Sequence, residues 1–147
     1  MQFNDLAAQY RHLKKEIDAG IASVIEGAHF ISGPQVEELD RELWAYTGRK
    51  YCVSTSNGTD ALRMPLMAMG VGEGDAVFVP AFTFYASAEV ISLCGATPVF
   101  VDSDPRTFNL SPDSLREQID RVKREGKLKP KGVVAVDLFG LPVDFPK

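Results

Sequence analysis

Apolar residues recur at helical spacing in the first part of the sequence. The recurring positions, which share one helix face, are Leu13, Ile17, Ile21, Val24 and Ile25. They predict a long amphipathic helix, and Gly27 is well placed to end it. A loop over residues 28–33 follows, and Pro34 suits the first turn of a second helix. The apolar face of this second helix is formed by Val36, Leu39, Leu43 and Trp44.

Short runs of β-branched residues alternate with helical segments over the rest of the chain. The predicted strands are residues 51–53, 76–79, 98–101 and 132–136. The predicted helices are residues 61–69, residues 85–93 and a helix that opens with Ser111 as its N-cap and Pro112 in its first turn. This alternation indicates an α/β fold with a mostly parallel sheet flanked by helices. Both faces of a parallel sheet need cover, and no helix follows the last strand. The domain is therefore expected to be incomplete at its C-terminus.

Composition and charge argue against several classes of protein. Of the 147 residues, 45% are hydrophobic and 24% are charged, as in an ordinary globular domain. The formal net charge of −4 provides no basic field for nucleic acid. No apolar run is long enough to span a membrane, and the N-terminus lacks the apolar segment of a signal peptide. We expect a cytoplasmic protein without nucleic-acid or membrane partners.

The cysteine and histidine residues give no indication of a metal site. Cys52 and Cys94 lie in or near apolar runs and lack a CxxC spacing, so they are expected to be reduced, packed thiols. His12 falls on the first helix and His29 in the loop after it, without metal-ligand spacing.

Polar and aromatic residues gather where the predicted strands end. These ends are residues 54–60, 81–84, 102–104 and 137–140. In open parallel sheets, ligands bind beyond the carboxyl ends of the strands. The pattern therefore predicts a binding site at this edge of the sheet.

The loop Ser56-Asn57-Gly58-Thr59-Asp60 is the most informative of these ends. Gly58 lets backbone N–H groups approach an anion closely, Thr59 adds a hydroxyl donor, and the following helix points its positive end at the same place. An ordinary N-cap explains the same residues, since Ser, Asn, Thr and Asp all favour that position. The spacing alone leaves both interpretations open. The loop is neither a P-loop nor a GxGxxG motif.

The second loop carries a run of aromatic residues, Phe82, Phe84 and Tyr85. One of these rings is suited to stack on a planar heterocycle, but burial in the core is the commoner explanation for such residues. Asp102 and Asp137 are single carboxylates at strand ends. Each is a helix cap, a hydrogen-bond acceptor or a catalytic group, and the sequence does not decide between these roles.

Three stretches together resemble one known family. They read "GPQVEELDRELWAYTGRKYCVSTSNGTDAL", "GEGDAVFVPAFTFYASAEVISLCGATPVFVDSDPRTFNLSP" and "VDLFGLPVDF". Their order and content are similar to those of the DegT/DnrJ/EryC1/StrS nucleotide-sugar aminotransferases. These are pyridoxal 5'-phosphate (PLP) enzymes with the aspartate-aminotransferase fold (PLP fold type I). The opening of the chain resembles members that aminate C3 of UDP-linked 3-keto sugars, including the uronic-acid type.

The resemblance implies roles for particular residues. Gly58 and Thr59 would hold the cofactor phosphate, with Asn57 beside them, and Phe84 would stack on the pyridine ring. The loop residues Phe30, Ile31 and Ser32 would lie near the sugar or the second subunit of a homodimer. Residues 1–33 would form an N-terminal helix and loop, and residues 34–147 the first part of the large PLP-binding domain. The rest of that domain and a small C-terminal domain would be absent from this chain.

The resemblance also implies that the catalytic residues lie elsewhere. In the family, the Schiff-base lysine and the aspartate that pairs with the pyridinium nitrogen come later in the chain, beyond Lys147. The 147 residues alone are thus expected to be inactive, because the chemistry needs that amine. Many relatives also have His where this chain has Asp137, so a role of that histidine cannot be transferred.

The function expected from the resemblance is transfer of an amino group, from glutamate, to a keto group of a nucleotide-linked sugar. The product would serve polysaccharide or glycan precursor synthesis. One alternative is a truncated or degenerate relative without catalysis, acting as a regulatory or interaction module. Without the resemblance, a Rossmann-like nucleotide binder is a third reading, which is disfavoured because no glycine fingerprint follows the first strand.

Overall fold

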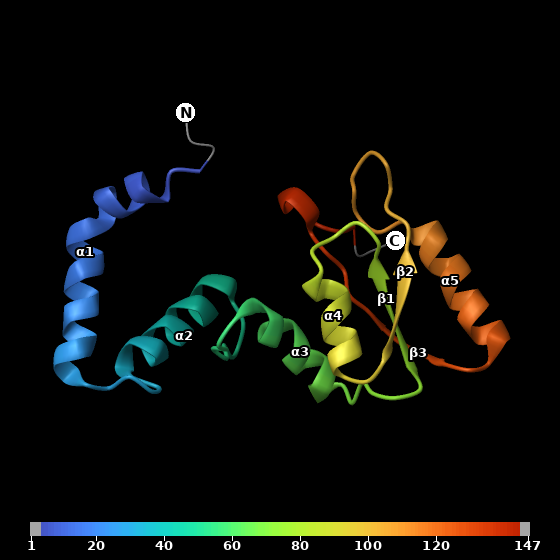
Figure 1. Ribbon diagram of the computed structural model, residues 1–147, viewed down its shortest axis with the longest axis horizontal. Helices are drawn as coiled ribbons and strands as arrows, with labels where there is room; N and C mark the ends of the chain where they lie inside the picture. The colour runs from blue at the N-terminus through green and yellow to red at the C-terminus, as the bar shows by residue number, and fades with distance from the viewer. Residues whose placement is uncertain (1–3, 145–147) are drawn as a thin grey trace. The chain divides into compact units, whose positions relative to one another are not determined.

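A computed structural model describes residues 4–144 of the chain. Contacts between Cα atoms divide the chain into two compact units, Met1–Ser54 and Thr55–Lys147. The first unit is helical, and the second unit contains the sheet (Figure 1).

Two helices make up most of the first unit, as the apolar pattern predicts. Helix α1 spans Leu6–Gly27, and the carboxylate of its N-cap Asp5 accepts a hydrogen bond from the N–H of Ala8 (2.8 Å). Helix α2 spans Pro34–Thr47 and ends at Gly48, whose φ of 66° is in the left-handed region. Neither helix has a buried residue among those described. Within residues 4–144, no side chain of either apolar face is therefore buried.

The corner between α1 and α2 has a fixed shape. Ala28 and Ser32 have φ angles of 51° and 47°, a region that L-residues seldom adopt. A Cβ atom on Gly33 would lie only 2.6 Å from the backbone oxygen of His29, so this position requires glycine. The side chains of Phe30 and Ile31 in this corner are 69% and 91% exposed.

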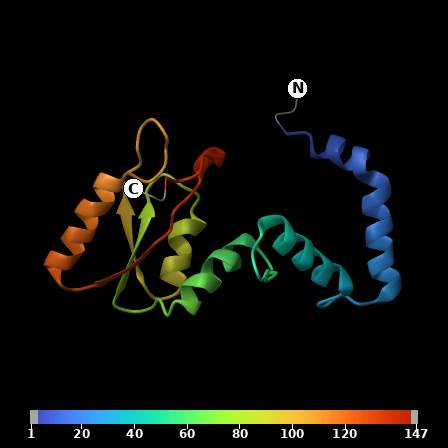
Figure 2. The same cartoon turned by 180° about the vertical axis from the view of Figure 1, so that it is seen from behind.

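The second unit contains a three-stranded parallel sheet with helices on both faces (Figures 1 and 2). The strands are β1 (Asp75–Pro80), β2 (Thr97–Val101) and β3 (Lys129–Val133), and their order in the sheet is β2-β1-β3. The helices are α3 (Gly58–Ala68), α4 (Ala86–Leu93) and α5 (Pro112–Glu125), and a short 3₁₀ turn, η1, covers Leu138–Gly140. The expected α/β fold with a mostly parallel sheet is confirmed.

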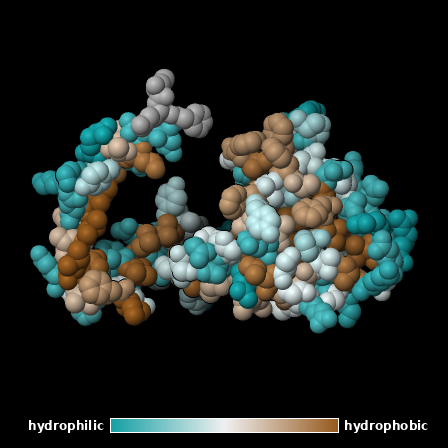
Figure 3. Space-filling model, in the orientation of Figure 1, coloured by the Kyte–Doolittle hydropathy of each residue, from teal (hydrophilic) through white to brown (hydrophobic). Residues whose placement is uncertain are grey.

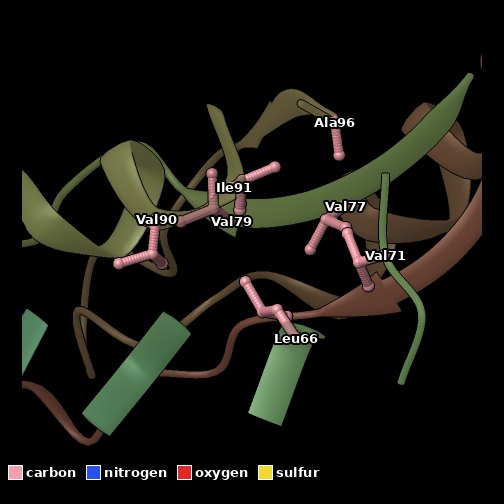
Figure 4. Close-up of a cluster of buried hydrophobic side chains, with 7 residues drawn as sticks. All are labelled: Leu66, Val71, Val77, Val79, Val90, Ile91 and Ala96. Carbon is pink, nitrogen blue, oxygen red and sulfur yellow. The ribbon is translucent and has the colours of Figure 1, made fainter. Parts of the chain in front are cut away.

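Strand β1 has a core on each of its faces because successive side chains of a strand point in opposite directions. Val77 and Val79 pack with residues of α3 and α4 in the cluster of Figure 4, which comprises Leu66, Val71, Val77, Val79, Val90, Ile91 and Ala96. Ala76 and Phe78 point to the other face. The cluster there comprises Ala76, Phe78, Val99, Val101, Leu110 and Val122, with Val122 supplied by α5. All residues of β1 after Asp75 are buried, which makes β1 the rigid centre of this unit.

The strand predicted at residues 51–53 does not form. These residues belong to no strand, and Tyr51 and Val53 are 71% and 68% exposed. A strand exists only where a neighbouring backbone pairs with it. Both sides of β1 are occupied by β2 and β3, and within residues 4–144 no other strand pairs with residues 51–53.

The last predicted strand is displaced toward the N-terminus. It was expected at residues 132–136 from its β-branched residues, but β3 covers Lys129–Val133. Backbone pairing of Asp75 with Lys129 fixes this start, and the register shifts between Ala76 and Val77. Val134 still donates its N–H to the carbonyl of Phe78 (2.8 Å), so the contact with β1 continues just past the strand.

Candidate functional site

The three strands are parallel, so the segments that follow them lie at one edge of the sheet. The arrowheads of β1 and β2 point toward the loop after Pro80, the loop after Val101 and the turn η1 (Figures 1 and 2). Three of the four segments that the sequence singled out thus lie at one edge. The fourth segment, residues 54–60, leads into α3 in the same unit.

Helix α3 begins with a side-chain cap. The Oδ1 atom of Asn57 accepts a hydrogen bond from the N–H of Asp60 (2.9 Å), and its Nδ2 atom donates to the carboxylate of Asp60 (2.9 Å). The hydroxyl of Ser56 donates to the same carboxylate. The N-cap interpretation of this loop is therefore confirmed, and α3 begins at Gly58, three residues earlier than predicted.

The cap leaves donors free at the same helix end. Among the described residues, neither the backbone N–H of Gly58 nor that of Thr59 has an acceptor, and the hydroxyl of Thr59 has no partner either. A Cβ atom added to Gly58 would meet nothing within 4 Å. The φ angle of Gly58 is not in the left-handed region. Neither packing nor backbone conformation explains this glycine. Free N–H groups, a hydroxyl and a helix dipole suit a phosphate, so the donor set fits the cofactor that the resemblance implies.

The loop after β1 is anchored by hydrogen bonds at Ala81, Thr83 and Phe84. Ala81 donates its N–H to the carbonyl of Val101 (2.8 Å), and the hydroxyls of Thr83 and Ser87 are 3.0 Å apart. The carbonyl of Phe84 accepts a hydrogen bond from the N–H of Ser87 (3.1 Å). These contacts fix the backbone that carries the aromatic side chains.

The aromatic residues of this loop are not core residues. Phe82 is 52% exposed, Phe84 is 77% exposed and Tyr85 is 74% exposed. Of the two interpretations that the sequence left open, burial in the core is thus wrong for all three. The ring of Phe84 makes no ring–ring contact within the described part of the chain, so its faces are accessible.

Phe82 belongs to a cluster of three aromatic rings, the Phe82/Phe108/Phe139 cluster. The ring centroids of Phe82 lie 5.9 Å from Phe108 and 6.4 Å from Phe139, and those of Phe108 and Phe139 lie 5.8 Å apart. Such tilted and edge-on geometries are favourable for aromatic pairs. Phe108 and Phe139 have φ angles of 62° and 56°, which costs about 1–2 kcal/mol for each residue. Phe108 and Phe139 were not predicted as partners of Phe82, because no local sequence signal marks a phenylalanine with a positive φ angle.

Two of the aspartates that follow the strands, Asp104 and Asp137, accept hydrogen bonds from backbone N–H groups through their carboxylates. Asp137 accepts a hydrogen bond from the N–H of Val143 (2.9 Å), as expected for one of the roles left open for it. Asp104 accepts from the N–H groups of Arg106 (2.8 Å) and Thr107 (3.0 Å), and these bonds lower the pKa of its carboxyl below the ordinary value. Asp102 is exposed, and its N–H donates to the hydroxyl of Ser114 (3.0 Å).

The remaining candidates from the sequence are the loop residues 30–32 and the two cysteines. Loop residues Phe30, Ile31 and Ser32 are exposed. The thiols of Cys52 and Cys94 are free, and burial raises the pKa of the Cys52 thiol. Over residues 4–144, no cluster of His, Cys, Asp and Glu side chains could hold a metal ion. No helix in the same range is long and apolar enough to cross a membrane.

Comparison with known proteins identifies the family. The sequence profile of the DegT/DnrJ/EryC1/StrS aminotransferase family matches residues 11–147, and the chain belongs to this family. The aminotransferases of the family bind PLP or its amine form, pyridoxamine 5'-phosphate. The fold is accordingly that of the PLP-binding aminotransferases, present here in part.

Two curated relatives and one solved structure are similar over nearly the whole chain. UDP-2-acetamido-2-deoxy-3-oxo-D-glucuronate aminotransferase from Pseudomonas aeruginosa is 45% identical over 99% of this chain and 38% of its own length. A pleiotropic regulatory protein from Geobacillus stearothermophilus is 41% identical over 96% of this chain and 36% of its own length. The crystal structure of a DegT/DnrJ/EryC1/StrS aminotransferase from Brucella abortus has a TM-score of 0.96 and 46% identity, over 99% of this chain and 39% of that one. The chain thus spans well under half the length of the relatives it matches.

Proposed function

We propose that this chain provides the cofactor-binding part of a PLP-dependent sugar aminotransferase. The observation that carries the proposal is the open N-terminus of α3, where Gly58 and Thr59 leave donors without acceptors in the described chain. These donors would hold the phosphate of PLP, and Asn57 would keep the helix end in shape through its bond to Asp60. The exposed ring of Phe84 would lie against the pyridine ring.

The residues of this chain would bind and orient rather than transfer protons. When bound, PLP supplies a carbonyl that takes up an amino group and a ring that withdraws electrons. Neutral donors at α3 would fix one end of the cofactor, and Phe84 would set the plane of its ring. We place the Schiff-base lysine and the aspartate that pairs with the pyridinium nitrogen outside these 147 residues. On that basis residues 1–147 alone have no transaminase activity.

The proposed substrates are a nucleotide-linked keto sugar and an amino-acid donor, glutamate. The 45% identity with an aminotransferase that acts on a UDP-linked 3-oxo-glucuronate favours a UDP-linked sugar with a keto group at C3. An enzyme of this kind would act in the cytoplasm, in the synthesis of polysaccharide or glycan precursors. Residues 1–33 would form the N-terminal helix and loop, and residues 34–147 the first part of the large domain.

A homodimer is part of the proposal. The apolar stripe of α1 has no cover within the described chain, and its residues include Leu6, Tyr10, Leu13, Ile17, Ile21 and Ile25. Figure 3 shows this stripe as a band of hydrophobic residues along α1. A second copy would cover it, and the exposed loop residues Phe30, Ile31 and Ser32 would then lie near the sugar or the partner subunit.

Substitution of Gly58 tests the phosphate site. Gly58→Ala puts a methyl group into open space, so the fold should be retained, but the methyl group would stand where the phosphate has to approach the N–H groups. We expect the dissociation constant for PLP to rise about tenfold or more, which corresponds to about 1.4 kcal/mol. PLP binding to the full chain is measured by absorbance titration.

Gly20→Ala is the matched control, because Gly20 also has nothing within 4 Å of its Cβ position and lies on α1. Its PLP affinity should equal that of the unsubstituted chain. Equal affinities for Gly58→Ala and Gly20→Ala would disprove the phosphate site.

A second candidate function is a regulatory module without catalysis, which the name of the Geobacillus relative favours. Borohydride reduction of a complete protein that contains this chain, in the presence of PLP, separates the two. The aminotransferase should be labelled on one lysine outside residues 1–147, as found by mass spectrometry. Absence of label would favour the module, and label on Lys123, Lys129 or another lysine of this chain would overturn the placement of the catalytic lysine.

A further inference from the structure

Asn109 is a buried amide that joins two segments distant in sequence. Its side chain is 8% exposed, and its Nδ2 atom donates to the carbonyls of Leu141 (3.1 Å) and Pro142 (3.3 Å). Its Oδ1 atom is buried and has no hydrogen-bond partner in the described chain. An unsatisfied buried oxygen is unfavourable, so an asparagine here calls for an explanation beyond packing.

The segment that Asn109 holds is closed by a second side chain. Asp137 accepts a hydrogen bond from the N–H of Val143 (2.9 Å), so the turn from 137 to 143 is tied at both ends. Within this turn Phe139 has a φ of 56°. A bulky residue keeps such a conformation only when its surroundings determine it, and the bonds from Asn109 and Asp137 provide this constraint.

The constrained Phe139 connects the turn to the loop after β1. Its ring packs edge-on against Phe108 (5.8 Å) and Phe82 (6.4 Å). Phe108 directly precedes Asn109 and also has a positive φ, of 62°. Phe82 lies two residues before Phe84 in a loop whose other residues are anchored by hydrogen bonds at Ala81, Thr83 and Phe84. The ring cluster supplies the missing anchor at Phe82.

We propose that Asn109 is a positioning residue, which holds the 137–143 turn so that Phe139 and Phe108 fix Phe82 and thereby set the orientation of the Phe84 ring. The part that concerns the cofactor rests on the proposed function. Asn109 does not touch the cofactor site itself. It acts through the turn, the ring cluster and the 81–84 loop.

The amide group is specifically suited to this role. Two carbonyl oxygens need a donor with two N–H bonds, which the NH₂ group of asparagine has. An aspartate of the same shape would place a carboxylate against both carbonyls, and an aliphatic residue would leave them unpaired. The unpaired Oδ1 atom is thus the accompanying cost of the only small side chain that can bridge Leu141 and Pro142.

The orientation of residue 84 can be measured without cofactor. Trp44 is the single tryptophan of the chain, so Trp44→Phe with Phe84→Trp places one indole at the position in question. In this background, Asn109→Asp should lower the fluorescence anisotropy of the indole, because the loop gains freedom. Gln118→Glu on α5 makes the same amide-to-carboxylate change at a half-buried position with no side-chain hydrogen bond in the described chain, and it should leave the anisotropy unchanged.

An anisotropy that is equal in Asn109→Asp and Gln118→Glu overturns the positioning role. If Asn109→Asp is unfolded by circular dichroism, Phe139→Gly replaces it, since glycine accepts the positive φ. Phe139→Gly removes the whole side chain, so its anisotropy should fall in the same way, and an unchanged value again overturns the role.

A PLP titration of the chain with its native Phe84 separates this inference from the proposed function. We expect Asn109→Asp to bind PLP about tenfold more weakly than Gln118→Glu, with a smaller induced circular dichroism per bound cofactor at saturation. Loss of stability alone would leave the dichroism of the saturated protein unchanged. If the unsubstituted chain does not bind PLP, the proposed function fails, while the anisotropy still decides the positioning role.

Discussion

Single polar residues of the second unit act mainly through hydrogen bonds to the backbone. Asn57 caps α3, Asp104 holds the start of the loop after β2, Asp137 closes the 137–143 turn, and Asn109 bridges two carbonyls. Each of these polar side chains thus fixes a loop or a helix end through its hydrogen bonds. The free donors of Gly58 and Thr59 are different, because the described chain gives them nothing to bind.

Asp104 makes stability depend on pH. The N–H groups of Arg106 and Thr107 lower the pKa of its carboxyl, so the charged form is favoured in the folded state. The stabilisation is fully present above the unfolded pKa of about 3.9 and is lost as pH falls through the lower folded pKa. Asp104→Asn should therefore be less stable than the unsubstituted chain at pH 7, and the difference should shrink below about pH 4.

Denaturant unfolding at pH 7, 5 and 3 measures this difference. Asp120→Asn, at an exposed position of α5, is the control and should show no comparable change between these pH values. A difference between Asp104→Asn and the unsubstituted chain that stays constant down to pH 3 would contradict the role of the charge.

At the scale of elements, two helices begin with the same kind of cap but should differ in function. Ser111 accepts a hydrogen bond from the N–H of Ser114 (3.3 Å), as Asn57 does from Asp60. Removing either cap by Asn57→Ala or Ser111→Ala should lower the free energy of unfolding by about 1 kcal/mol. Only Asn57→Ala should also weaken PLP binding, because α3 alone presents the phosphate donors. Thermal unfolding and PLP titration of the two variants check this, and equal PLP affinities would speak against α3.

Elements with a strong local pattern were predictable from the sequence, and those that depend on a partner were not. The helices and the apolar strands β1 and β2 were predicted within a few residues, since their apolar spacing and caps are local signals. Strand β3 begins at Lys129 and includes Pro130, which local preferences disfavour, and its position follows from pairing with β1. Residues 51–53 show the converse, because an apolar run without a pairing partner forms no strand.

The same distinction applies to the site. The free helix end at Gly58 and the exposed ring of Phe84 were anticipated from spacing and resemblance, whereas their roles toward PLP remain proposals. The contacts of Asn109 with Leu141 and Pro142 span more than 30 residues of sequence. A contact of this separation leaves no trace in the local pattern, which is why Asn109 was not among the sequence candidates.

For the whole molecule, the two units differ in how far they satisfy their own apolar surface. The second unit has a core on both faces of β1, but the helices of the first unit bury none of their described residues. Burial of apolar side chains is the main favourable contribution to folding, so we expect another segment or molecule to pack on the apolar stripe of α1. A second copy of the chain is the occupant we propose.

Ile17→Glu should weaken this association, because it puts a charge in the middle of the apolar stripe of α1. Ala19→Glu introduces the same side chain at an exposed position about half a helical turn away, on the opposite face of α1, and should not affect it. Sedimentation velocity over a range of concentrations gives the dimer fraction of each variant. A dimer that persists in Ile17→Glu, or an unsubstituted chain that is monomeric throughout, would contradict the proposed contact.

The composition of the two outer strands has a consequence for aggregation. Strands β2 and β3 each have one edge without a partner in the described sheet, and such edges can pair with strands of other molecules. Pro98 in β2 and Pro130 in β3 lack the N–H that intermolecular pairing needs, and Lys129 and Lys131 add charge beside Pro130. The features that made β3 hard to recognise as a strand therefore also protect the open sheet from edge-to-edge association.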